Sequence, residues 1–283
     1  MTVFELYKLC GDELQKAETE NAENEARMIA EKALRFDKMQ FLLNKNERVD
    51  EDSVTDAKEM LSKRLSGLPI QYILGEWDFY GRSFKVGEGV LIPRPETEEL
   101  CSLVIEKLKK KPGAVVFDLC SGSGCIGITI QKEVPNASVY LVELYDDAIK
   151  YLNENRISHG LARSVPLIKG DVLSGYEAFG FLPKPDVIVS NPPYIKNQEL
   201  SSLQKEVQNE PQSALDGGED GLVFYRALCE KWFPKINDGG FLAVECGDEQ
   251  GSEIASIFSK ISRNVSVHKD FNGSERFVIA EKG

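Results

Sequence analysis

An asparagine followed by two prolines and a tyrosine (Asn191, Pro192, Pro193, Tyr194) is the segment of this chain best suited to chemistry. It follows the apolar run 187–189, whose composition is typical of a strand buried on both faces. Neither proline can donate a backbone hydrogen bond, so strand pairing must stop there, and Asn191 is restricted to extended geometry. The Asn191 amide is therefore held at the carboxyl end of a strand, where open α/β sheets bind their ligands. A rigid amide beside an aromatic ring suits a planar ligand group that carries an NH2.

A second motif lies upstream, where a strand predicted over residues 114–119 includes Asp118 and runs into a glycine-containing loop. Glycine allows positive φ angles and a close approach of the backbone to a ligand, and the start of the following helix adds a positive pole. The next predicted strand, 138–143, ends in Glu143, whose carboxylate can accept hydrogen bonds from both hydroxyls of a ribose. The loop consists of Cys120, Ser121, Gly122, Ser123 and Gly124.

This pattern alone leaves two classes of enzyme open. Gly122, Gly124 and Gly127, with Glu143 downstream, match the dinucleotide-binding fingerprint of a nicotinamide (NAD-dependent) oxidoreductase. Asp118 is better explained if it faces an amino-bearing ligand, such as the amino-acid portion of S-adenosylmethionine. The Asn-Pro-Pro-Tyr segment has no role in hydride transfer. The combination favours a methyltransferase, and a noncatalytic binding role is weaker still because it leaves that segment unexplained.

The composition of the chain limits which kinds of binding partner are expected. The 283 residues include 34 basic and 46 acidic side chains, a net charge of −12, which disfavours nonspecific nucleic-acid binding and suits a basic protein partner. The six cysteines and two histidines show neither zinc-type spacing nor the density of a disulfide scaffold, so we predict no metal and reduced thiols. The N-terminal residues resemble no signal peptide and no apolar run has membrane-spanning length, which predicts a cytoplasmic protein without membrane contact.

The distribution of glycine and proline indicates where the domains divide. Residues 12–66 contain neither, and amphipathic helices are predicted near 3–17, 23–35 and 52–65. We therefore predict a helical bundle over 1–72 that docks the substrate, a β-hairpin linker over 73–94, and a catalytic domain over 95–283. In the last, strands near 165–168, 185–190 and 240–246 alternate with helices, and 265–267 pairs with 277–280 in a closing antiparallel hairpin. The predicted fold class is α/β: a doubly wound, Rossmann-like methyltransferase sheet with a small N-terminal helical domain.

Two short segments carry two interpretations each. Pro93-Arg94-Pro95 is either a simple start to the helix predicted over 98–110 or one wall of a cofactor pocket. Asp171 either accepts a hydrogen bond from an adenine amino group, with Val172 packing on the ring, or serves as a plain N-cap or turn residue.

Taken together, these residues resemble the HemK family, the protein-(glutamine-N5) methyltransferases of peptide chain release factors. The resemblance covers most of the chain, including its helical front part. It implies transfer of a methyl group from S-adenosylmethionine to the side-chain amide nitrogen (N5) of the Gly-Gly-Gln glutamine, with S-adenosylhomocysteine as product, release factors as partners and no metal. Its motifs are residues 69–75, 91–98, 118–127 and 191–195, then Glu210-Pro211 and 214–222.

The resemblance also implies residue roles. The loop 120–124 would line the methionine part of the cofactor, Glu143 would hold its ribose, and Asp171 with Val172 would flank its adenine. Asn191 would contact both cofactor and substrate, and the segment from Asn191 to Tyr194 would grip the glutamine. Cys120-Ser121 departs from the Gly-Thr common in the family, and Val172 stands where relatives often carry an aromatic residue.

Other acceptors within reach of this chemistry remain open. A ribosomal-protein glutamine is one alternative within the family. An adenine-N6 methyltransferase of DNA is another, since it holds its NH2 group with the same kind of tetrapeptide. The acidic charge and the lack of a Lys/Arg-rich recognition segment disfavour DNA.

Overall fold

The computed structural model describes all residues from 1 to 283, and the chain divides into two compact units. The first comprises Met1–Glu76 together with Gln204–Asn209, and the second comprises Trp77–Leu203 with Glu210–Gly283. The polypeptide therefore leaves one unit for the other after Glu76, after Leu203 and after Asn209. No helix combines the length and the apolar composition that crossing a membrane would need.

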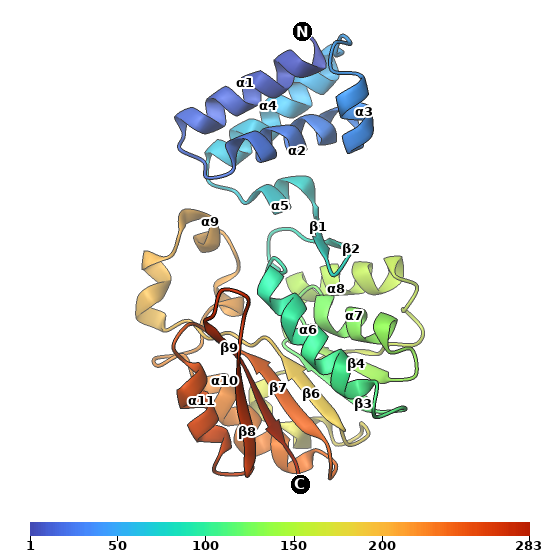
Figure 1. Cartoon of the computed structure of the whole chain (residues 1–283), viewed down its shortest axis with the longest axis vertical. Coiled ribbons are helices and arrows are strands. Elements are labelled where there is room, and N and C mark those ends of the chain that lie inside the picture. Colours follow the sequence, from blue (N-terminus) through green and yellow to red (C-terminus); the bar gives the residue numbers. More distant parts are fainter. The chain divides into compact units, whose positions relative to one another are not determined.

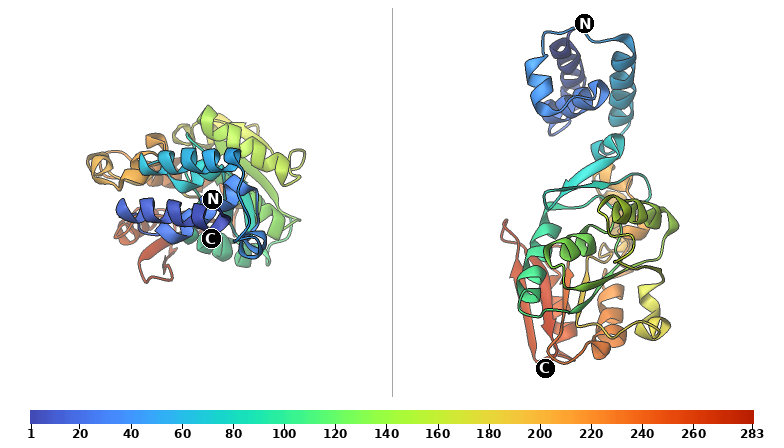
Figure 2. Two further views of the ribbon diagram at one scale, coloured as in Figure 1. Left: turned by 90° about the horizontal axis from the view of Figure 1, so that it is seen from above. Right: turned by 90° about the vertical axis from the view of Figure 1, so that its right-hand side faces the viewer.

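The first unit is built from helices α1 (Val3–Lys16), α2 (Ala22–Leu34) and α4 (Glu51–Leu65), which lie side by side in Figures 1 and 2. These are the three helices that the amphipathic pattern predicts, and their presence is confirmed. The short helices α3 (Lys38–Leu43) and α5 (Ile70–Leu74) were not predicted, because one or two turns give no measurable periodicity. The apolar stripes meet in a core that contains Leu6, Cys10, Ala26, Ile29 and Leu61.

The segment Gln204–Asn209, which includes helix α9 (Lys205–Gln208), is fastened to this helical unit by an ion-pair cluster. Arg64 lies buried on α4; its Nε is 2.6 Å from Oε2 of Glu25, and its guanidinium also pairs with Glu206. Asn209 adds a hydrogen bond from its side chain to the Gly67 carbonyl at 3.0 Å. Breaking a buried pair of this kind by removing one partner costs several kcal/mol, roughly 3–5.

The second unit is organised around a seven-stranded sheet in the order β5-β4-β3-β6-β7-β9-β8. The first five strands in that order are parallel, and β9 runs antiparallel to both β7 and β8. The predicted parallel sheet with a closing antiparallel hairpin is confirmed. The strands are β3 (Val115–Leu119), β4 (Ser138–Glu143), β5 (Leu167–Lys169), β6 (Val187–Ser190), β7 (Phe241–Glu245), β8 (Asn264–Lys269) and β9 (Glu275–Glu281).

Helices cover both faces of this sheet (Figures 1 and 2). Helices α6 (Pro95–Leu108), α7 (Cys125–Glu133) and α8 (Asp146–Ser158) pack on one face. The other face packs against α10 (Val223–Ala227), the π-helical turn Leu228–Trp232 that continues it, and α11 (Gly251–Phe258). A short hairpin, β1 (Glu76–Phe79) and β2 (Arg82–Lys85), precedes the sheet as predicted.

Strand order reverses between β3 and β6, because β4 and β5 lie on one side of β3 while β6 and β7 lie on the other. Such a reversal opens a crevice at the carboxyl ends of the two strands, the usual ligand site of doubly wound sheets. Gly127 lets α7 approach closely there, since a Cβ atom at this position would lie 2.3 Å from Leu141 Cδ2 on β4. The crevice therefore collects the ends of β3 and β6, the strands that carry the two sequence motifs.

Candidate active site

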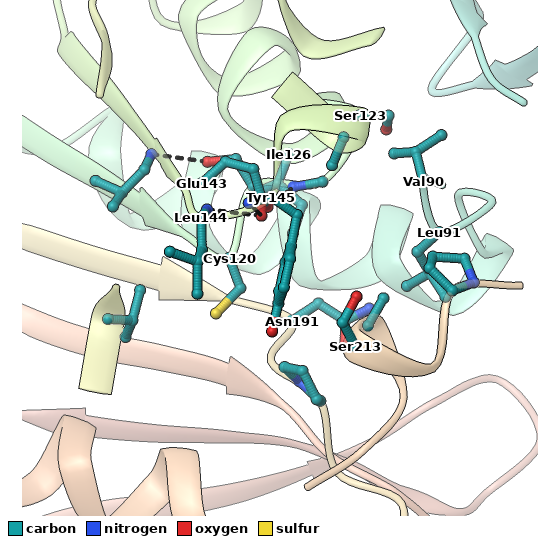
Figure 3. A pocket seen from close by; sticks show the side chains of 18 of the residues that line it. Val90, Leu91, Cys120, Ser123, Ile126, Glu143, Leu144, Tyr145, Asn191 and Ser213 are labelled. Atoms are coloured by element: carbon teal, nitrogen blue, oxygen red, sulfur yellow. Dashed lines mark hydrogen bonds between the residues drawn. The ribbon is translucent and has the colours of Figure 1, made fainter. Parts of the chain in front are cut away.

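A pocket of about 230 Å³ opens at the carboxyl ends of β3, β4 and β6 in the second unit (Figure 3). Apolar side chains supply much of its wall, including Val90, Leu91, Ile126 and Leu144. A mostly apolar pocket with a few convergent polar groups is the usual form of a small-molecule site. The predicted site residues that line it are Cys120, Ser121, Gly122, Ser123, Glu143, Asp171, Val172, Asn191 and Pro193.

The glycine loop lines the pocket with Cys120, Ser121, Gly122 and Ser123. Gly122 donates its N–H to Glu143 Oε2 at 2.9 Å, which ties the loop to the end of β4. Gly124, with a φ of +81°, is the N-cap residue that precedes α7 and lies outside the lining. Cys120 also has a left-handed backbone, with a φ of +59°, which is costly for any residue that carries a Cβ. The loop conformation is thus imposed by its surroundings rather than chosen by Cys120.

The Glu143 carboxylate accepts most of its hydrogen bonds from the protein itself. Its Oε1 accepts the N–H groups of Leu144 at 2.7 Å and Tyr145 at 3.0 Å, in addition to the Gly122 bond on Oε2. A carboxylate offers about four lone-pair positions, so roughly one remains for a ligand hydroxyl. The sequence predicted acceptance from two ribose hydroxyls, and the geometry leaves room for fewer.

Asp118 lies beneath the pocket and is not part of its wall. Alternation along β3 points Asp118 to the same face as Val116, and α7 covers that face. Its Oδ2 accepts the N–H of Gly127 at 2.9 Å, whereas Oδ1 is buried without a hydrogen-bond partner. Burial raises the pKa of the carboxyl to about 7. The position differs from the predicted one, in which Asp118 faces the ligand directly.

Two segments that carried two interpretations each lie at the pocket; the turn or helix-start role is seen in both, and the ligand-binding role of each stays a prediction. Asp171 lines the pocket, and its Oδ1 also caps a 3-10 turn by accepting the Leu173 N–H at 2.8 Å. Pro93 and Arg94 likewise line the pocket, while Pro95 is the first residue of α6. A residue at the start of a helix can face a ligand because the free N–H groups of the first turn point the same way.

The Asn-Pro-Pro-Tyr segment meets the pocket through Asn191 and Pro193, while Pro192 and Tyr194 are not in its lining. Ser190 Oγ donates to the Leu119 carbonyl at 2.6 Å, which joins the end of β6 to that of β3. Asn191 is half-buried, and its Nδ2 donates to Thr97 Oγ1 at 3.2 Å. Burial raises the pKa of the Tyr194 phenol well above its usual range, so the ring stays neutral.

A glycine-rich segment holds the tyrosine from behind. The Ile195 N–H donates to Leu215 O at 2.9 Å, and the Gly217 N–H donates to Ile195 O at 2.8 Å. A Cβ atom at Gly217 would lie 2.7 Å from Tyr194 Cα, and one at Gly221 would lie 2.4 Å from Tyr194 O. Only glycine allows the backbone to come this close to Tyr194. The motif at residues 214–222, to which the sequence analysis assigned no role, therefore supports the tyrosine.

Glu210 is a second residue whose role sequence reasoning missed. Its Oε2 accepts the Ile92 N–H at 3.0 Å, and its carboxylate also pairs with the Arg94 guanidinium. It therefore ties the 211–214 wall of the pocket to the 92–94 wall. The Glu-Pro pair belonged to the family resemblance, but nothing in the sequence indicated its partner.

Comparison with known proteins decides the family. Residues 5–75 match the model of the PrmC N-terminal domain, and residues 96–231 match that of the methyltransferase small domain. The release factor glutamine methyltransferase of Thermodesulfovibrio yellowstonii is 38% identical over 262 residues, covering 91% of this chain and 92% of that protein. That of Bacillus cereus is 37% identical over 287 residues, covering 99% of each. The chain belongs to the release factor glutamine methyltransferase family.

A solved methyltransferase from Pyrococcus furiosus has the same fold, with a TM-score of 0.52 at 18% identity, over 80% of this chain and 99% of that one. The predicted family resemblance and the Rossmann-like methyltransferase fold are both confirmed. The protein is therefore an S-adenosylmethionine-dependent methyltransferase, and the oxidoreductase alternative is set aside.

Proposed function

We propose that this protein methylates the side-chain N5 of the Gly-Gly-Gln glutamine of peptide chain release factors. The observation that carries the proposal is the orientation of the Asn191 amide beside the pocket. Its Nδ2 is engaged by Thr97, which leaves Oδ1 to accept a hydrogen bond. An acceptor held rigidly after a strand suits a substrate that presents N–H groups, as a glutamine amide does.

The pocket residues suit S-adenosylmethionine. Backbone groups of the loop 120–123 would hold the methionine part, Glu143 the ribose, and Asp171 with Val172 the adenine. The unpaired Oδ1 of Asp118 adds a negative charge, when ionised, beneath the loop, which favours a cationic ligand above it. When bound, S-adenosylmethionine supplies a methyl carbon that is activated by the positively charged sulfur.

Catalysis by this chain would be mainly positional. An amide nitrogen is a poor nucleophile because its lone pair is delocalised into the carbonyl. The Asn191 Oδ1 and the Pro192 carbonyl would accept the two N–H groups, and Tyr194 would pack on the amide plane. Fixing two reactants in this way is worth about 7–11 kcal/mol. Methylation would leave the amide nitrogen with two protons and a positive charge, and this cation is acidic enough to lose one proton to water, so no side-chain base is needed.

The helical unit is the proposed docking element for the release factor. Helix α3 exposes three apolar side chains, Met39 at 69%, Leu42 at 60% and Leu43 at 77%. We call these the α3 patch. Exposed apolar side chains grouped on one short helix are a common mark of a protein-binding surface. A double Leu42→Ser, Leu43→Ser variant should raise the KM for release factor roughly fivefold, with unchanged affinity for S-adenosylmethionine; Ile157→Ser on α8 is the control.

The deciding experiment uses labelled S-adenosylmethionine and four acceptors: a release factor, the same factor with its Gly-Gly-Gln glutamine replaced, ribosomal proteins and DNA. Methyl transfer to the native factor alone is the expected result. Transfer to ribosomal protein or to DNA, with none to the native factor, would replace the proposal with the corresponding alternative.

A further inference from the structure

We infer that Thr97 and Glu245 are positioning residues that fix which end of the Asn191 amide faces the substrate. This inference rests on the proposed function and deepens it. The three residues come from separate elements of the second unit: Thr97 from the first turn of α6, Asn191 from the end of β6, and Glu245 from the end of β7. Thr97 and Glu245 are each only 2% exposed, so water does not compete for their hydrogen bonds.

The bonds run in one direction. Thr97 Oγ1 donates to Glu245 Oε2 at 2.7 Å, and Asn191 Nδ2 donates to Thr97 Oγ1 at 3.2 Å. A threonine hydroxyl has a single proton, and this one is given to the carboxylate. Toward Asn191 it can therefore offer only a lone pair, which attracts the NH2 end of the amide and repels the oxygen. The Asn191 oxygen is left as the acceptor for the ligand.

The hydrogen bonds from Asn191 to Thr97 and from Thr97 to Glu245, which we call the relay, have a consequence for specificity. With its oxygen outward, Asn191 binds a group that donates hydrogen bonds, such as the NH2 of a glutamine side chain. A glutamate carboxylate in the same position would set one acceptor against another, and both would lose their hydrogen bonds to water without gaining a partner. The relay would thus help the site to distinguish glutamine from glutamate, although neither Thr97 nor Glu245 acts on the reacting nitrogen itself.

The direction of the relay depends on the charge of Glu245. When protonated, this carboxyl can donate to Thr97 Oγ1, which frees the threonine proton to turn toward Asn191 and reverses the polarity. Burial raises the pKa of Glu245 to about 7. Turnover should accordingly fall as the pH drops through this value. Several charged or titratable groups surround Glu245. They are Arg94, Glu96 and Cys101 on the α6 side, Cys125 on α7, Arg276 on β9, Tyr194 after β6, Tyr225 on α10 and the adjacent Cys246.

The first test removes the hydroxyl while keeping the side-chain shape. Thr97→Val should lower kcat for the release factor roughly 10- to 100-fold, with the Kd for S-adenosylmethionine unchanged within twofold by calorimetry. Thr97→Ser should restore most of the rate. The matched control is Thr129→Val, because Thr129 is also fully buried and its Oγ1 has no hydrogen-bond partner; its turnover should equal that of the wild type.

The second test reverses the relay. Glu245→Gln supplies an amide that can donate to Thr97 Oγ1, so turnover should fall by about 100-fold and its pH dependence near 7 should disappear. Glu281→Gln, at a carboxylate on β9 that pairs with Lys107, is the control for the loss of one charge. In an Asn191→Ala background, Thr97→Val should add no further loss, because Thr97 acts only through Asn191.

The outcomes separate the two proposals. A wild-type enzyme that does not methylate release factors would overturn the proposed function. If the wild-type enzyme methylates release factors, two results would overturn the relay alone. One is a Thr97→Val variant as fast as the wild type, and the other is an additive loss of rate when Thr97→Val is combined with Asn191→Ala. If Thr97→Val does not fold, the rate and pH profile of Glu245→Gln decide the question.

Discussion

The pocket has two walls that bind by different means. The loop wall, residues 120–123 with Glu143, is proposed to hold the cofactor mainly through backbone groups of the loop. The amide wall, Asn191 with its supports Thr97 and Glu245, depends on one side-chain amide and on the buried groups that orient it. Backbone donors survive a change of side chain, whereas an oriented amide has no substitute. We therefore expect the chain to tolerate side-chain replacement in the loop wall and not in the amide wall.

The largest effect should come from the amide wall. We expect Asn191→Ala to lower kcat by about 100-fold or more, since it removes an oriented acceptor from the reacting group. The Kd for S-adenosylmethionine should change far less, which titration calorimetry can check. Asn272→Ala, in an exposed turn between β8 and β9, is the control. A purified Asn191→Ala enzyme with near-normal turnover would remove the distinction between the walls.

In the loop wall, replacing Glu143 should have the largest effect on cofactor affinity. Glu143→Gln replaces an acceptor with a donor next to three backbone N–H groups. Because charge-assisted hydrogen bonds contribute roughly 1.5–3 kcal/mol, the Kd for S-adenosylmethionine should rise at least about 10-fold. At saturating cofactor, kcat should recover most of its value. A variant with normal affinity and a low kcat would contradict this assignment.

Asp118, beneath the loop wall, should affect how the free energy of unfolding depends on pH. Its folded pKa of about 7 lies above the ordinary value of 3.8, so the folded state favours the protonated form. Its contribution to stability is therefore fully present below about pH 4 and is lost as the pH rises through about 7. Asp118→Asn lacks this titration. Urea unfolding at pH 5 and pH 8 gives the decrease in unfolding free energy between these two pH values. This decrease should be smaller in Asp118→Asn than in the wild type by roughly 1–3 kcal/mol. Equal losses in both proteins would show that Asp118 does not titrate as described.

The smallest effect should come from the loop side chain with the strained backbone. Cys120→Gly relieves a left-handed φ of +59°, worth roughly 1–2 kcal/mol, but glycine loses more backbone entropy on folding and gives up the packing of the thiol. The two effects nearly cancel, so the free energy of unfolding should change by less than about 1 kcal/mol. Cofactor affinity should stay within about threefold, because the loop binds through its backbone. A large loss of affinity would make the loop wall as dependent on side chains as the amide wall.

Sequence reasoning found the parts of both walls that are written in consecutive residues. The Asn-Pro-Pro-Tyr stop after a buried strand, the glycine loop and the terminal carboxylate of the next strand each follow from local rules of backbone geometry. The main helices follow from apolar periodicity for the same reason. Asp171 and the Pro-Arg-Pro segment were each left with two interpretations, and only the structure shows that Asp171, Pro93 and Arg94 line the pocket.

Only the tertiary structure decided which distant residues support these parts. Thr97, Asn191 and Glu245 lie far apart in the chain and meet because the parallel strands β6 and β7 end at one edge of the sheet, where helix α6 begins. Gly217 and Gly221 reach Tyr194, and Arg64 reaches Glu206, through equally long-range contacts. The face of β3 on which α7 packs decided that Asp118 lies under the pocket instead of in it. Local propensity depends on neighbouring residues, whereas hydrogen-bond partners depend on how strands are ordered and helices pack, and no single stretch of sequence carries that information.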